Sequence, residues 1–163
     1  MPNLRLNVPL VGQQHGYDGQ PIERRDHNGI ARPWGINACW YASACMVSYY
    51  FQRGPRLGLP ALWRADLGLN IREFDRLARS EGLLRLVEPH GGFSPDFIAE
   101  TLRTRGPIWA AMSLPSGDKH VAVLTGVRAN TLYYNDPSPP ARLQDDFLDF
   151  QFDALFVKNP DWL

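Results

Sequence analysis

The sequence predicts an α+β fold, with helices in its first two thirds and an antiparallel sheet in its last third. Apolar residues over 39–51 recur at helical spacing, and two later segments up to residue 105 begin and end with helix-capping residues. From residue 108 onward, short apolar and aromatic runs alternate with turn residues, which is typical of strands. Helices first and strands second favour two packed halves over alternating βαβ units.

The N-terminal part leads to one well-marked helix. Residues 7–11 form a short apolar stretch, for which we expect a strand or an extended arm, and residues 13–33 are polar and typical of a long surface loop. Over 39–51 the apolar residues lie three or four positions apart, and Gly54 with Pro55 follows directly. The pattern therefore predicts a helix over 39–51 that ends before this pair.

Two further helices are indicated by their ends. Asn70 with Glu73 three residues later resembles a capping box, and Gly82 closes the segment. Ser94 is a typical N-cap residue followed by a proline, and Gly106 with the next proline stops the third helix.

The C-terminal half predicts the sheet. Its apolar runs cover 108–114, 121–127, 131–135 and 152–157. Since turn residues separate them, we expect antiparallel strands. A cleft between the helical half and the sheet half is a natural place for a site.

Bulk composition limits the function classes. The chain has 163 residues, 44% hydrophobic and 21% charged, with a formal net charge of zero. This length fits a single domain, residues 1–163, and the charge gives no electrostatic case for nucleic acid or a membrane surface as partner. The first ten residues lack the apolar run of a signal peptide, and no stretch approaches the length of a membrane span, so we expect a soluble chain.

The cysteines and histidines exclude two further classes. Cys39 and Cys45 lie six residues apart on one predicted helix and face different ways, so they cannot form a disulfide, which suits a reducing cytosol. The histidines are dispersed along the chain, at His15, His27, His90 and His120. We therefore discount a metal site.

Three residues stand in an order that suits covalent catalysis. Cys39 opens the first predicted helix, where unpaired backbone N–H groups favour a thiolate. His120 opens an apolar strand after a turn-like segment, as a rigidly held general base would, and Asp136 follows the next strand. Each has a simpler interpretation: a buried cysteine, a strand-edge histidine and an Asp-Pro turn. Together they predict nucleophile, base and orienter, provided that Asp136 reaches the second nitrogen of His120.

The remaining candidates are interpreted structurally. Cys45 lies in the middle of the helix beside apolar residues, so we expect a buried small hydrophobe. Trp40 is expected to pack between the two halves, Trp109 in the core and Trp34 on the cleft wall.

Five segments carry a resemblance to the papain-like cysteine proteases: residues 8–13 (Val-Pro-Leu-Val-Gly-Gln), 39–47, 106–109, 120–127 and 136–137. They look most like the compact bacterial branch related to bacteriocin-processing peptidases and to a protease effector of plant pathogens. The resemblance implies a papain-like fold, with an N-terminal helical half carrying the cysteine helix and a C-terminal antiparallel β-sheet half. It also implies proteolysis of protein substrates by Cys39, His120 and Asp136, without a cofactor.

In that family a glutamine before the cysteine donates a hydrogen bond to the oxyanion, and the Val-Pro-Leu pattern carries this role onto Gln13. The family's glutamine usually lies only a few residues before the cysteine, whereas here twenty-six positions separate them. Gln14 and Asn37 therefore remain alternatives.

The resemblance further implies a bacterial effector or toxin, either alone or as the toxin domain of a larger effector. Such a protein acts in the cytosol of a target cell after delivery and requires an immunity protein that covers its cleft. The same three residues also serve amidases, deamidases and transglutaminases, and a catalytically silent binding domain is the alternative outside the enzymes.

Overall fold

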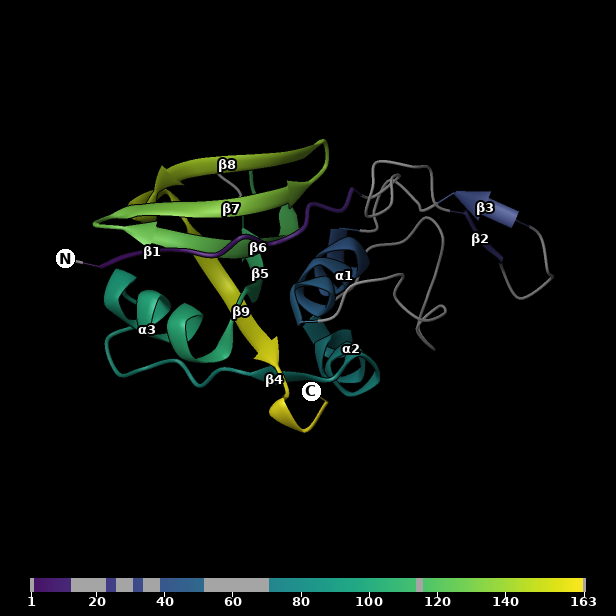
Figure 1. Cartoon of the computed structure of the whole chain (residues 1–163), viewed down its shortest axis with the longest axis horizontal. Coiled ribbons are helices and arrows are strands. Elements are labelled where there is room, and N and C mark those ends of the chain that lie inside the picture. Colours follow the sequence, from purple (N-terminus) through teal and green to yellow (C-terminus); the bar gives the residue numbers. More distant parts are fainter. Residues whose placement is uncertain are drawn as a thin grey trace.

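The computed structural model describes residues 2–12, 23–25, 31–33, 39–51, 71–113 and 116–162. It confirms the predicted α+β class, with helices packed around a seven-stranded antiparallel sheet (Figure 1). The α-helices are α1 (Cys39–Phe51), α2 (Phe74–Glu81) and α3 (Pro95–Arg105). The strands of the large sheet are β1 (Asn3–Arg5), β4 (Leu83–Arg85), β5 (Ile108–Ser113), β6 (Lys119–Arg128), β7 (Thr131–Pro137), β8 (Pro140–Asp146) and β9 (Gln151–Lys158). Two short strands, β2 (Glu23–Arg25) and β3 (Ala31–Pro33), pair with each other in a separate two-stranded sheet.

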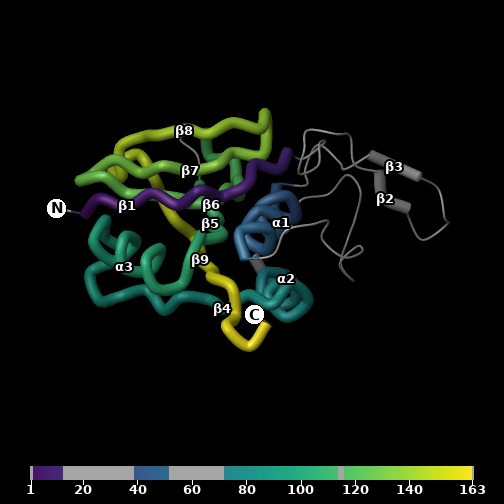
Figure 2. Tube along the Cα trace, viewed as in Figure 1, coloured from purple at the N-terminus to yellow at the C-terminus, as the bar shows by residue number. Residues whose placement is uncertain are grey.

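The sheet has the order β4-β9-β5-β6-β7-β8, and β6 is its most fully paired strand. Its first half pairs with β5 from Lys119 to Leu124, and its last three residues pair with β1, from Gly126 to Arg128. The N-terminus thus belongs to the sheet of the C-terminal half, and the chain then crosses towards α1 (Figure 2). The predicted division into two halves is therefore not strictly sequential.

Both faces of the central strands are buried. Alternate residues of β5 belong to two different clusters of buried hydrophobic residues, one on each face of the sheet. Trp109 packs on the side of α1 and α2, and Ala110 packs on the side of α3. The same alternation continues in β6 and β9. Figure 2 shows α3 on one side of β9 and α1 on the other. Since α1 lies directly on the sheet, its first turn has a defined place relative to the strand ends.

The helix ends agree with local sequence in two of three cases. Helix α1 has the predicted bounds, and α3 begins after Ser94, whose Oγ accepts a hydrogen bond from the Phe97 backbone N–H at 3.1 Å. Helix α2 begins later than predicted, after a 3₁₀ turn at Ile71–Glu73. Glu73 occupies the N-cap position of α2, and its side chain makes no cap hydrogen bond to that helix. The predicted pair of Glu73 with Asn70 stays a prediction. Asn70 lies outside the described residues.

The strands extend beyond their apolar runs. Strand β6 begins at Lys119, two residues before the predicted run, and β7 continues to Pro137 because β8 pairs with it. Residues 7–11 are not a strand but an extended arm that follows β1. In the part of the chain that the structure describes, no helix is long and apolar enough to span a membrane.

Candidate active site

Cys39 is the first residue of α1, and two long-range hydrogen bonds hold this end of the helix against the sheet. The indole Nε1 of Trp109 on β5 donates to the Trp40 carbonyl oxygen at 2.9 Å. One turn after Cys39, the Ser43 hydroxyl donates to the carbonyl oxygen of Val121 on β6 at 3.3 Å. Because Val121 is the neighbour of His120, the second bond connects the first turn of α1, which contains Cys39, to the strand that carries the histidine.

His120 lies between Cys39 and Asp136. Its Nε2 is 2.9 Å from Asp136 Oδ1, and its imidazole also takes part in a side-chain hydrogen bond with Cys39. Since Nε2 is occupied by the carboxylate, Nδ1 is the nitrogen left for the thiol. The structure thus brings Cys39, His120 and Asp136 together, from α1, β6 and β7 respectively.

The surroundings of His120 favour its protonated form. Burial alone would lower the pKa of this imidazole, but hydrogen bonds with Asp136 and Cys39 and the charges of both groups raise it from 6.5 to about 10. The side chains of His120 and Asp136 are 16% and 18% exposed, so the pair is largely withdrawn from water yet still reachable. An imidazolium held in this way is the natural counterion of a thiolate.

Asp136 is itself held in place. Its Oδ1 accepts a second hydrogen bond from the Ser138 backbone N–H at 2.9 Å, two residues further on. An acceptor fixed by a local backbone donor is well suited to orient an imidazole ring. The Asp-Pro sequence is therefore both a turn and a contact of His120.

The other predicted residues divide between the core and the undescribed parts. Cys45 is fully buried, whereas Cys39 is partly exposed, and neither forms a disulfide. Trp109 lies in the core as predicted, and Trp40 is buried between α1 and the sheet. Gln13, Gln14, Asn37 and Trp34 lie outside the described residues. Among the described residues, no three His, Cys, Asp or Glu side chains gather into a group that could hold a metal ion.

Sequence reasoning missed the residues that hold the three candidates in place. Ser43 carries a weak signal, because a polar side chain one helical turn after the cysteine shares its face. Asn135 and Ser138 flank Asp136 within three positions, but their partners are decided by distant or backbone contacts.

The arrangement can perform acyl transfer. It offers a thiol at a helix N-terminus, a histidine that can exchange a proton with that thiol, and a carboxylate that keeps the ring oriented.

Comparison with known families agrees with this chemistry. The family described as papain-like cysteine protease AvrRpt2 matches residues 34–154, well over half of the chain. The matched region contains Cys39, His120 and Asp136 and excludes residues 1–33.

Proposed function

The chain belongs to the papain-like cysteine protease family of AvrRpt2, and we propose that Cys39, His120 and Asp136 are its catalytic triad. Membership makes the protein a cysteine peptidase with protein substrates. The observation that carries the proposal is the position of His120, which contacts both Cys39 and Asp136 and has its pKa raised to about 10.

In the first half of the reaction, the Cys39 thiolate attacks the carbonyl carbon of the scissile peptide. The C–N bond breaks as the His120 imidazolium donates its proton to the leaving amine, and an acyl-thioester remains on Cys39. Asp136 keeps the ring oriented while its charge changes.

In the second half, neutral His120 takes a proton from water as the water oxygen attacks the thioester carbonyl. The C–S bond breaks, the carboxylic acid product leaves, and Cys39 departs as a thiolate. The thiolate and the imidazolium of His120 are thereby restored.

The oxyanion that forms in each half requires hydrogen-bond donors. We assign the Cys39 backbone N–H and the Gln13 side chain to this role, with Gln14 and Asn37 as alternatives. The position of Gly12, the residue before Gln13, supports this assignment. Gly12 lies against Pro140, the first residue of the strand that follows the Asp136 turn: a Cβ atom at Gly12 would lie 3.0 Å from Pro140 Cγ.

We further propose that the protein is a bacterial effector or toxin protease, delivered into a target cell and neutralised in its producer by an immunity protein that covers the cleft. The support is chemical: neither Cys39 nor Cys45 forms a disulfide, and a thiol nucleophile works in a reducing cytosol.

The experiment that tests this function is a map of new protein N-termini in cells that express the wild type, compared with cells that express Cys39→Ala. Proteolysis predicts new N-termini only in the wild type. Deamidation or transglutamination would instead change side-chain masses without breaking chains. A binding domain would leave both samples alike, and Cys39 would not react with a thiol electrophile directed at the active site.

A further inference from the structure

The carboxylate of Asp136 lies beyond the point at which its strand parts from β6. The β6–β7 pairing ends at Val123 and Asn135, whereas β7 continues to Pro137 and pairs there only with β8. Asp136 must nevertheless reach back to His120 on β6. Backbone pairing between the two strands therefore does not determine the distance between these side chains.

Asn135 occupies the last paired position and anchors β7 to a third segment. Its side chain is buried, with the residue only 2% exposed, and its Nδ2 donates to the carbonyl oxygens of Val8 at 3.1 Å and Pro9 at 3.4 Å. Arg142, the residue of β8 that pairs with Asn135, donates from Nη2 to the same Val8 oxygen at 3.2 Å. Two neighbouring strands thus hold one carbonyl group of the N-terminal segment.

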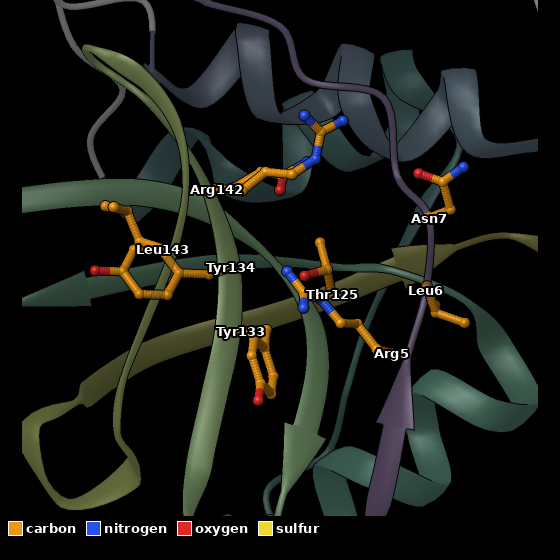
Figure 3. Close-up of a pocket in the computed structure, with 9 residues that line it drawn as sticks. Arg5, Leu6, Asn7, Thr125, Tyr133, Tyr134, Arg142 and Leu143 are labelled. Atoms are coloured by element: carbon orange, nitrogen blue, oxygen red, sulfur yellow. The ribbon is translucent and has the colours of Figure 1, made fainter.

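This segment, the N-terminal arm (residues 6–12), is itself firmly seated. The Leu6 backbone N–H donates to the Thr125 carbonyl oxygen at 2.7 Å, and Val8 and Val11 are buried in the core beneath α1. In Figure 3, Arg142 extends from β8 towards this arm, whereas the adjacent Leu143 points away from it. The arm is therefore packed against the sheet and α1, and the end of β7 can be fixed to it.

We propose that Asn135, assisted by Arg142, is a positioning residue for the hydrogen bond between Asp136 and His120. The amide locks the last paired residue of β7 to the arm, so that the next residue presents its carboxylate to the histidine. This inference rests on the proposed function, because it assigns a role within the same triad. Without the anchor, the strand end moves away from β6 and the imidazolium loses its partner for part of the time.

The charged groups around His120 leave few competing explanations for a pH effect. Cys39 of α1 and Asp136 of β7 are the groups that act on it among the described residues. Lys119, the preceding residue of β6, forms an ion pair with Asp153 of β9 at 3.2 Å. A change in the titration of His120 after substitution of Asn135 is therefore transmitted through the triad.

The test compares Asn135→Ala, Arg142→Ala and Arg142→Lys with the wild type, and uses Leu143→Ala on the same strand as the matched control. Asn135→Ala is expected to lower kcat by roughly 10- to 100-fold with little change in KM, as misplacement of a catalytic contact does. It should also slow alkylation of Cys39 by iodoacetamide and move the alkaline limb of the pH profile to lower pH. Arg142→Ala should act in the same direction but less, Arg142→Lys should restore activity, and Leu143→Ala should leave it unchanged.

A double-mutant cycle separates positioning from general destabilisation. In the Asp136→Asn background, Asn135→Ala should cost little further activity, because the contact that it positions is already altered. Additive losses would overturn the inference, and so would a folded Asn135→Ala protein with wild-type kcat. A slower hydrolysis with unchanged alkylation and pH limb would also overturn it, because the anchor would then act elsewhere. If Asn135→Ala fails to fold, unchanged kcat in Arg142→Ala overturns the proposal. Failure of the proposed function is a separate result: Cys39→Ala would then remain active.

Discussion

Replacing Asp136 with asparagine isolates the contribution of one negative charge to the site. The substitution keeps the size of the side chain and a group that can bond His120, but it removes the carboxylate that faces Nε2 at 2.9 Å. An opposite charge at such a distance raises the pKa of an imidazole by about 1 to 3 pH units. Hence the pKa of His120 in the variant should fall by that amount from about 10.

The sign of the activity change follows from the role of the imidazolium. In the proposed mechanism His120 must carry a proton to release the amine, so activity should be lost as pH rises through the apparent pKa of the Cys39–His120 pair. The alkaline limb of kcat/KM should therefore move to lower pH in Asp136→Asn. We expect activity near neutral pH to fall by about 10- to 100-fold, less than the full contribution of general acid–base catalysis, because the amide still holds the ring.

The substitution should also change how the stability of the protein depends on pH. A folded-state pKa raised above 6.5 contributes stability that is fully present below pH 6.5 and is lost as pH rises through about 10. In the variant this contribution should be smaller, and its loss should be complete at a lower pH. The melting temperature, measured across the alkaline range for both proteins, tests this directly.

The assay is a kcat/KM profile on a peptide substrate, with Asp153→Asn as the control. This control removes a carboxylate that bonds Lys119 and Ser113 instead of His120. An alkaline limb that stays in place in folded Asp136→Asn protein would refute the reasoning, and a shift of equal size in Asp153→Asn would show that the effect is not specific to the triad.

Four further outcomes are expected. Cys39→Ala and His120→Ala should each abolish turnover while circular dichroism shows an intact fold, since the pair acts as a unit; wild-type turnover in either variant contradicts the triad. Iodoacetamide should label partly exposed Cys39 much faster than fully buried Cys45, which peptide mapping after brief exposure decides. Gly82→Ala should lower the free energy of unfolding by at least about 1 to 2 kcal/mol, because Gly82 has a φ of 66° and a Cβ there would meet the Trp162 ring; an unchanged denaturation midpoint would argue against that contact. Expression of the wild type in a bacterial cytosol should arrest growth, whereas Cys39→Ala should not; normal growth with abundant thiol-reactive protein would reject the toxin role but not the peptidase.

Local sequence was sufficient for the elements whose signals lie within a few residues. Helix α1 runs from Cys39 to Phe51 as its spacing predicts, and α3 begins after the Ser94 cap. Caps and periodicity are short-range properties, so they can be recognised without knowledge of partners. Strand β8, by contrast, is mostly exposed and polar, so no apolar pattern in the sequence predicts it.

The candidate site divides in the same way. The residue types and chain order of Cys39, His120 and Asp136 are enough to predict a nucleophile, a base and an orienter, and the structure brings these three together. The residues that hold these three in place could not be predicted, because Asn135, for example, bonds the Val8 carbonyl oxygen across 127 positions of sequence.

Side-chain chemistry and neighbours along the chain are enough to predict the candidate reactive groups and most of the helices, because both are short-range properties. The three-dimensional packing, by contrast, is needed to see that β7 leaves β6 at Asn135, that Asn135 bonds the N-terminal arm there, and that Asp136 still reaches His120. Those outcomes depend on pairings between distant segments, whose geometry is set by how the sheet, α1 and the arm pack together.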